Sequence, residues 1–279
     1  MRILLTGATG QVGWELRRTL APLGEVKFFD RFGLDLADTP LLVATVRALQ
    51  PAVIVNAAAY TAVDRAEAER DLAFAVNATA PRVLAEEAKR SGALLVHYST
   101  DYVFDGGKES PYVEEDPTRP INVYGESKLA GEQAIARSGC RQLVLRTSWV
   151  YGPRGRNFYL TMLRLAKERP ELRVVDDQVG APTSSLEIAR ATAALIGKGA
   201  LGLYHMTAAG STTWCGFARA ILEQAGIDTP VAAIRTEDYP TPAKRPRNSR
   251  LDCAKLRGAH GVALAPWEQA LAEVTSTAR

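Results

Sequence analysis

The chain has 279 residues, of which 47% are hydrophobic, 23% charged and 7% aromatic. This composition is ordinary for a folded globular protein with one large domain or a domain and a smaller lobe, and it excludes disordered, fibrous and collagen-like chains. The 34 basic and 31 acidic residues leave a net charge of +3 without a basic run, so no nucleic-acid partner is expected.

In the first half of the chain, short apolar runs alternate with longer amphipathic segments. The apolar runs are rich in Val, Leu and Ile and predict parallel strands at Arg2–Thr6, Glu25–Asp30, Ala52–Ala58, Leu94–Ser99 and Leu143–Ser148. The amphipathic segments predict helices at Gln11–Leu20, Pro40–Leu49, Phe74–Arg90 and Tyr124–Arg137. This alternation predicts an α/β fold with a doubly wound, Rossmann-like parallel sheet, which binds ligands at the carboxyl ends of its strands.

After about Gly152 the alternation becomes less regular and prolines accumulate. Here we predict helices at Asn157–Glu168 and Ser184–Gly197, and strands at Leu172–Asp176 and Gly202–Thr207. Residues 1–150, with 184–209 returning to them, are expected to form a dinucleotide-binding domain. Residues 151–183 and 210–279 are expected to form a smaller, C-terminal substrate-binding lobe.

Three glycines follow the first predicted strand and open the first helix: Gly7, Gly10 and Gly13. Glycines allow a tight turn, let the backbone approach a pyrophosphate and let the helix pack on the strand. Free N–H groups at the start of the helix then face the anion. The spacing is GxxGxxG and not GxGxxG, so the position between strand and helix, more than the pattern, predicts a dinucleotide site.

The second predicted strand ends at Asp30, where an acid typically binds the ribose hydroxyls of NAD. Arg31 follows and is suited to the 2′-phosphate of NADP, so either NADH or NADPH is expected. Asp35 and Leu36 lie where the next loop reaches the adenine. The segment after the third strand, which is rich in alanine and includes Ala59, Tyr60 and Thr61, suits a backbone that passes close to a flat cofactor. Asn56 is expected to fix that loop.

Tyr124 and Lys128 stand four positions apart at the start of a predicted helix and so share one face. An ammonium beside a phenol favours the phenolate and lowers the pKa of the phenol. Such a pair can exchange a proton with a carbonyl oxygen while a hydride moves to the adjoining carbon. We therefore predict an acid–base site at Tyr124. The alternative is that this spacing marks only an ordinary helix face with an exposed lysine, which its place after the fourth strand of a dinucleotide-binding fold makes less favoured.

Further candidates stand at strand ends and in a late loop. Thr100 and Asp101 follow the fourth strand, where they can bind a substrate carbonyl or hydroxyl group or influence the tyrosine. Trp149 follows the fifth strand and is suited either to stacking on a sugar or base or to core packing. Arg245 and Arg250 could bind a diphosphate, with a solvated charged loop as the alternative. The three histidines are far apart and are interpreted as structural.

The cysteines, Cys140, Cys215 and Cys253, are spaced too widely for a CxxC unit, which indicates neither zinc nor a disulfide framework and favours the cytoplasm. The first residues run directly into a strand, and no apolar run reaches 18 residues. Neither a signal peptide nor a membrane anchor is therefore expected.

These motifs, with His97-Tyr-Ser-Thr-Asp-Tyr, Arg146-Thr-Ser-Trp-Val-Tyr and Arg245-Pro-Arg-Asn-Ser-Arg, make the chain similar over nearly its whole length to the extended short-chain dehydrogenase/reductases. Among these it resembles reductases of dTDP-linked sugars. The resemblance implies reduction of the C4 ketone of a dTDP-linked 4-keto-6-deoxyhexose to dTDP-L-rhamnose, a precursor of cell-envelope polysaccharide, by NADPH or NADH. It also implies Tyr124 as proton donor and contacts from Thr100, Asp101 and Trp149 to the substrate. The implied cofactor residues are Gly10, Gln11, Val12, Asp30, Asp35, Leu36, Ala59, Tyr60, Thr61, Tyr98, Tyr124 and Lys128.

Some members of this family are Mg²⁺-dependent homodimers, and Glu15 stands at a matching position here. Two other functions remain open at this point. Dehydratases and epimerases share the fold, but dehydratases carry an Asp-Glu pair where this chain has Asp101-Tyr102. The regulatory subunits of methionine adenosyltransferase also resemble the family, and such a protein would bind a partner without turning over a sugar.

Overall fold

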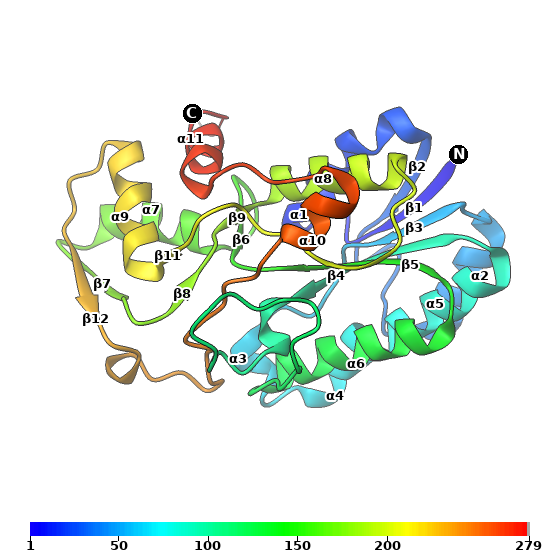
Figure 1. Cartoon of the computed structure of the whole chain (residues 1–279), viewed down its shortest axis with the longest axis horizontal. Helices are drawn as coiled ribbons and strands as arrows, with labels where there is room; N and C mark the ends of the chain where they lie inside the picture. Colours follow the sequence, from blue (N-terminus) through cyan, green and yellow to red (C-terminus); the bar gives the residue numbers. More distant parts are fainter. Residues whose placement is uncertain (278–279) are drawn as a thin grey trace.

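A six-stranded sheet forms the centre of the protein in a computed structural model that describes residues 1–277 (Figure 1). Its strand order is β10-β5-β4-β3-β1-β2, and every neighbouring pair is parallel. The strands are β1 (Arg2–Thr6), β2 (Glu25–Phe29), β3 (Val53–Asn56), β4 (Leu94–Thr100), β5 (Arg141–Thr147) and β10 (Gly202–His205). The chain moves outward from β1 to β2 and then returns past β1 to β3, so the order reverses between β1 and β3.

Helices cover both faces of this sheet, as the predicted doubly wound fold requires (Figure 1). Alternate side chains of β1 show why: Ile3 and Leu5 enter one apolar core, whereas Leu4 enters another. The first core includes α1 (Gln11–Thr19), α8 (Ser185–Gly197) and α10 (Ala254–His260). The second includes α2 (Thr39–Leu49), α5 (Ala80–Ser91) and α6 (Val123–Ser138). The parallel strands are therefore buried on both sides.

The single helix predicted at Phe74–Arg90 is interrupted in the structure. The segment consists of α3 (Val63–Ala66), α4 (Arg70–Phe74), a π-helical turn at Ala75–Thr79 and then α5. Pro81 lacks the N–H group that would bond the carbonyl of Asn77 in a regular helix. That carbonyl instead faces α6, where a Cβ atom at Gly131 would lie 2.2 Å from it. The irregular turn thus allows α6 to approach closely.

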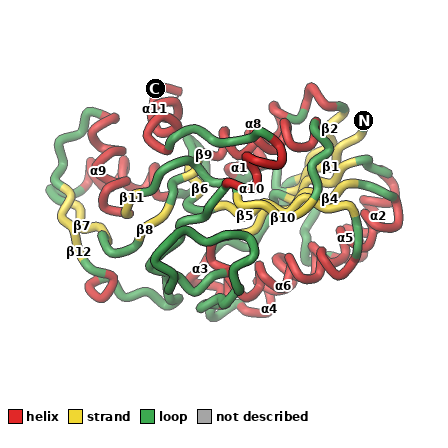
Figure 2. The backbone as a smooth tube through the Cα atoms, viewed as in Figure 1, coloured by secondary structure: helices red, strands yellow, loops and turns green. Residues whose placement is uncertain are grey.

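A second group of elements packs around its own apolar core, beside the main sheet. Its helices are α7 (Phe158–Glu168), α9 (Trp214–Ala225) and α11 (Trp267–Thr277). Three two-stranded sheets join them, β7 (Leu172–Val175) with β12 (Val231–Ile234), β6 (Val150–Tyr151) with β9 (Thr183–Ser184), and β8 (Val179–Gly180) with β11 (Thr212–Thr213). Figure 2 shows β7 and β12 at the far side of the molecule from β1 and β2, with β6 and β9 nearer the main sheet. Neither α9, α11 nor β12 was predicted.

The chain returns to the main sheet through α8 and β10, which pairs with β5. Leu256 of α10, in the segment expected to belong to the smaller lobe, packs in the core of the main sheet. The exact division between a dinucleotide-binding domain and a substrate lobe remains a prediction.

Single 3₁₀ turns lie at Ala21–Leu23, Asp101–Val103 and Thr236–Asp238. In the described part of the chain, no helix has the length and apolar character needed to span a bilayer.

Candidate active site

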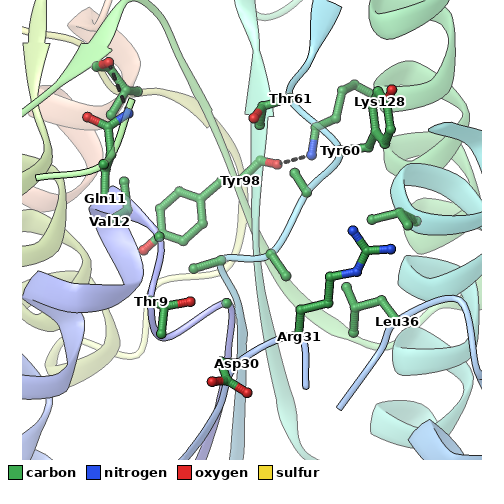
Figure 3. Close-up of a pocket in the computed structure, with 18 of the residues that line it drawn as sticks. Thr9, Gln11, Val12, Asp30, Arg31, Leu36, Tyr60, Thr61, Tyr98 and Lys128 are labelled. Atoms are coloured by element: carbon green, nitrogen blue, oxygen red, sulfur yellow. Dashed lines mark hydrogen bonds between the residues drawn. The ribbon is translucent and has the colours of Figure 1, made fainter. Parts of the chain in front are cut away.

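A cavity of about 470 Å³ lies at the carboxyl ends of the central strands, where their order reverses (Figure 3). Its lining comes from the turn after β1, the loops after β2 and β3, the end of β4 and the start of α6. Of the predicted cofactor residues it brings together Gly7, Gly10, Gln11, Val12, Asp30, Arg31, Asp35, Leu36, Ala59, Tyr60, Thr61, Tyr98, Tyr124 and Lys128. Gly13 alone of that set does not line it.

The glycine turn has the geometry of an anion cradle. Gly7 has a φ of +70°, and a Cβ atom there would lie 2.6 Å from the backbone nitrogen of Ala58. A Cβ atom at Gly13 would lie 2.0 Å from the carbonyl oxygen of Gly7, so this glycine lets α1 pack on the turn. Gly10 precedes α1 without a side-chain cap, which leaves the first N–H groups of the helix available to a phosphate. The turn therefore fits the pyrophosphate of a dinucleotide.

Asp30 and Arg31 lie at the end of the cavity away from Lys128 (Figure 3). Asp30 Oδ1 accepts a hydrogen bond from the Gly33 backbone N–H at 2.9 Å, so this carboxylate stabilises its turn as well as facing the cavity. The Arg31 guanidinium lies 3.7 Å from Asp35 and is 74% exposed, so the pair is weak. Both an acid and a mobile base are thus available to the ribose of a bound nucleotide.

The acid–base candidates converge from β4 and α6. Helix α6 begins at a fixed place because Asn122 Oδ1 accepts a hydrogen bond from the Gly125 N–H at 2.8 Å. Tyr124 and Lys128 follow on its first two turns and both line the cavity. Lys128 Nζ donates to the carbonyl oxygen of Tyr98 on β4 at 2.6 Å, as Figure 3 shows. Thr100, at the end of β4, donates to Asp101 Oδ1 at 3.0 Å.

The predicted lowering of the phenol pKa by Lys128 is not what the structure shows. Burial raises the pKa of Tyr124 well above its ordinary value, the charge of Asp101 raises it further, and a hydrogen-bonding interaction with Thr100 lowers it. The Lys128 amine is instead directed to Tyr98. Burial lowers the pKa of Lys128 to about 8, against the opposing charge of Glu132. In this state the phenol is protonated at neutral pH, which is the form a proton donor needs.

Asp101 is buried beside these groups with one oxygen, Oδ2, lacking a hydrogen-bond partner. Burial raises the pKa of Asp101 to about 6, although the nearby Ser249 and Thr100 hydroxyl groups oppose the shift. An unpartnered carboxyl oxygen in a buried site is costly, so this group is suited to take up a proton or to accept a hydrogen bond from a hydroxyl group outside the chain.

Asp101→Asn is expected to remove a pH dependence of stability. A carboxyl group with a raised pKa makes the folded protein bind its proton more tightly than the unfolded chain does, so stability is highest below pH 4 and falls as the pH rises to about 6. Two pKa units correspond to about 3 kcal/mol. Urea unfolding at pH 4 and pH 8 should show the variant gaining stability relative to the native chain at the higher pH. A constant difference between the two proteins would contradict this.

None of the predicted substrate residues lines the cavity: Thr100 and Asp101 lie buried behind Tyr124, and the other three lie further away. Trp149 has a positive φ of 48°, and its ring stacks on Trp214 at 3.5 Å between centroids. Arg245 forms an ion pair with Asp64 at 2.8 Å. Burial raises the pKa of Tyr102, and the charge of Arg245 opposes this shift. The Tyr102 ring contacts Tyr124 edge to face at 5.5 Å.

Arg250 donates to Asn248 Oδ1 at 2.8 Å and lines a separate cavity of about 320 Å³. The structure thus places Arg245 near Tyr124 and Arg250 elsewhere.

Asn77 is a site residue that the sequence analysis missed. Its Oδ1 accepts from the Tyr60 N–H at 2.8 Å, while its Nδ2 donates to the Tyr60 carbonyl and to Ser127 Oγ, each at 3.0 Å. Asn77, and not Asn56, therefore fixes the loop after β3. The only signal was a polar residue in an apolar stretch shortly before Pro81. Asn77 does not itself line the cavity; lining residues that were not predicted include Thr9, Leu34, Ser99, Thr147 and Arg156.

Gln11 connects the glycine turn to the second group of elements. Its Oε1 accepts a hydrogen bond from Asn157 Nδ2 at 2.8 Å, and its Nε2 donates to the Val150 carbonyl at 3.4 Å. Asn157 also begins α7, because its Oδ1 accepts from the Leu160 N–H at 2.9 Å. One side chain thus contacts both the turn and the first helix of the other lobe.

Glu15, the candidate Mg²⁺ ligand, pairs with Arg18 at 3.4 Å. Within residues 1–277, no group of three or more His, Cys, Asp or Glu side chains is arranged to hold a metal ion. The donor set of one chain therefore does not fit a bound Mg²⁺.

Comparison with known proteins agrees with this geometry. A family model described as the RmlD substrate binding domain matches residues 1–279. A dTDP-4-dehydrorhamnose reductase of Escherichia coli strain K12 is 49% identical, over 96% of this chain and 95% of the relative. One from Burkholderia thailandensis is 50% identical, with 97% of each chain covered.

Solved structures of such a reductase and of a related epimerase are similar to this chain over nearly their whole length. A dTDP-4-dehydrorhamnose reductase from Bacillus anthracis in complex with NADP is 38% identical, with a TM-score of 0.96 over 99% of each chain. A UDP-glucose 4-epimerase of Thermus thermophilus in complex with NAD has a TM-score of 0.86 at 23% identity, over 100% of this chain and 99% of the other, which indicates a shared fold only.

Proposed function

The chain belongs to the RmlD substrate binding domain family, and from this we infer that it is a dTDP-4-dehydrorhamnose reductase, an NAD(P)H-dependent oxidoreductase. Its reaction reduces the C4 ketone of dTDP-4-dehydro-6-deoxy-L-mannose to the hydroxyl group of dTDP-L-rhamnose. The observation that supports this function best is that Tyr124 and Lys128 both line a cavity whose glycine turn fits a dinucleotide, with the Thr100 hydroxyl interacting with the Tyr124 phenol.

We assign the proton donor to Tyr124. When bound in this cavity, a reduced nicotinamide would supply the hydride for the ketone carbon. The Tyr124 phenol, held protonated by burial, gives its proton to the carbonyl oxygen, so the C=O group becomes an alcohol and the phenolate remains. Thr100 interacts with the phenol and is placed to bind the same carbonyl oxygen. Lys128, fixed by the Tyr98 carbonyl, faces the cavity and is placed to bind the ribose of the cofactor.

For the substrate we propose contacts with Asp101, Trp149 and Arg245. Asp101 has an unpartnered oxygen close to Tyr124. The charge of Arg245 opposes the raised pKa of Tyr102, whose ring contacts that of Tyr124. Trp149 offers a ring already held by Trp214. Arg250 has less support, because it lines the second cavity. The resemblance also supports a cytoplasmic protein that pairs with a second copy of itself, with any Mg²⁺ site shared between copies.

The function is tested by following the absorbance of NADPH and of NADH when the dTDP-linked ketosugar is supplied. Loss of absorbance with formation of dTDP-L-rhamnose supports the reductase. Elimination of water from dTDP-glucose without net use of the reduced cofactor would support a dehydratase instead. Co-purification with a methionine adenosyltransferase, without ketone reduction, would support a regulatory subunit.

Arg31→Ala is expected to weaken NADPH binding about tenfold and to change NADH binding little. The exposed guanidinium reaches the ribose end of the cavity, and a charge-assisted hydrogen bond to a 2′-phosphate contributes about 1.5–3 kcal/mol. Fluorescence titration of both cofactors measures this, with Arg18→Ala as a control at a base that does not line the cavity. Equal loss of both affinities would show that Arg31 does not contact a 2′-phosphate.

A further inference from the structure

The short loop of residues 152–157 leads from β6 to α7 and borders the cavity that fits the cofactor. Gly155 and Arg156 of this loop both line the cavity, although they belong to the segment that we expected in the other lobe. A Cβ atom at Gly155 would lie 3.3 Å from Gln11 Cγ, so the loop touches the first residue of α1. The loop therefore meets the cavity at the glycine turn.

Three features determine the path of this loop. Asn157 Nδ2 donates to the carbonyl groups of Gly152 and Arg154 at 2.9 and 3.0 Å, which closes the loop on itself. Gly155 has a φ of +78°, a left-handed conformation that other residues rarely adopt. The Arg154 guanidinium lies 4.3 Å from the centroid of the Trp14 ring on α1, which is a cation–π contact. The loop is therefore closed on itself and held against α1.

Arg156 differs from the other two bases that line the cavity, because its side chain has no partner. Arg31 lies 3.7 Å from Asp35, and Lys128 donates to a backbone carbonyl at 2.6 Å. Within residues 1–277, the Arg156 side chain forms neither an ion pair nor a hydrogen bond. A guanidinium offers five N–H donors and keeps its charge at every physiological pH. Arg156 is thus a cation at the cavity that is free to bind an anion.

The position of the loop indicates which part of a dinucleotide Arg156 would meet. Helix α1 begins at Gln11 without a side-chain cap, so its first N–H groups suit the pyrophosphate. Figure 3 shows Gln11 well apart from Arg31, the base that we expect at a 2′-phosphate. Since Gly155 touches Gln11, the residue that follows it is placed closer to the pyrophosphate than to the ribose of the adenosine.

We propose that Arg156 binds the pyrophosphate of the dinucleotide, and that Arg154 positions the loop that presents it. This inference rests on the proposed use of NADPH or NADH. A pyrophosphate carries two negative charges, to which the start of a helix offers only about half a positive charge. The planar guanidinium of Arg156 adds a full charge and can donate two parallel hydrogen bonds to phosphate oxygens. Arg154 contacts the Trp14 ring and does not line the cavity, so it acts only through its neighbour.

The test is calorimetric titration of NADPH, NADH and ADP-ribose without any ketosugar. For Arg156→Gln we expect Kd to rise about tenfold for all three ligands, because each contains the pyrophosphate. Added salt should weaken binding to the unmodified protein more steeply than binding to the variant, which has lost one charge contact. Unchanged Kd values would overturn the proposal. A loss confined to NADPH would also overturn it, because Arg156 would then bind the 2′-phosphate.

Two further variants test the charge and the positioning role. Arg156→Lys keeps the charge without the planar fork, so its Kd values should lie between those of the unmodified protein and Arg156→Gln. Arg154→Gln should raise Kd about threefold alone and add nothing to Arg156→Gln, because its effect passes through Arg156. A lysine variant as weak as the glutamine variant would contradict the role of the charge. Additive losses in the double variant would contradict the positioning role of Arg154.

Arg164→Gln is the matched control, because this exposed base on α7 pairs with Glu168 and does not line the cavity. Its Kd values should equal those of the unmodified protein, and a tenfold rise would show an effect of net charge and overturn the assignment to Arg156. A protein that meets these expectations but reduces no ketosugar retains the pyrophosphate contact and loses the proposed reductase function. A protein that reduces the ketosugar but binds all three ligands equally well as Arg156→Gln retains the function and loses the contact.

Discussion

Tyr124→Phe is expected to lower kcat for ketone reduction by about 10²–10⁴-fold while the protein stays folded and still binds its cofactor. The phenylalanine keeps the ring and its edge-to-face contact with Tyr102 but lacks the hydroxyl group that transfers the proton. The hydride acceptor would then develop negative charge on oxygen without a proton donor. Initial rates with saturating cofactor and ketosugar measure the effect, and fluorescence titration checks cofactor binding.

Tyr204→Phe provides the matched control. Tyr204 lies on β10 and does not line the cavity; its hydroxyl donates to the Leu201 carbonyl at 3.0 Å and lies 3.0 Å from His260 Nε2. Its loss should leave kcat within about twofold of the unmodified enzyme. A rate for Tyr124→Phe in that same narrow range would show that another group delivers the proton.

Glu132→Gln is expected to lower the free energy of unfolding by about 3–5 kcal/mol. Glu132 on α6 and Arg146 on β5 form a two-pronged ion pair at 2.7 and 2.9 Å, with both side chains nearly fully buried. Neutralising the acid leaves the guanidinium buried without a counter-charge. The nearby His205 cannot compensate, because burial and the charge of Arg146 lower the pKa of His205 to about 3.

Chemical denaturation monitored by circular dichroism measures this loss. The control is Glu86→Gln, which breaks an exposed pair with Arg82 at 2.6 Å and should cost less than about 1 kcal/mol. Similar losses in the two variants would mean that the buried pair is not sensitive to the removal of its acid.

The main sheet and the cofactor cavity were predictable because local patterns determine them. Continuous apolar runs mark β1, β3, β4 and β5, and the glycine turn must lie at the end of β1. The position of Tyr124 and Lys128 four residues apart on α6 follows from helical periodicity alone.

Tertiary contacts determine the features that were missed or predicted wrongly. The pKa of Tyr124 depends on burial and on where the Lys128 amine points, neither of which the spacing of the two residues reveals. The interruption before α5 depends on how the carbonyl of Asn77 meets Gly131, more than 50 positions away in the chain. Helix α9 carried a local signal that was overlooked, since Thr213 caps it by accepting from the Gly216 N–H at 2.9 Å.

The bond between Gln11 and Asn157 makes the two halves of the molecule thermodynamically dependent on each other. A nucleotide that displaces the Gln11 side chain also removes a partner from the residue that starts α7. By reciprocity, whatever steadies α7 alters nucleotide affinity by the same factor. This single amide contact therefore links the affinity for a nucleotide to the stability of the far lobe.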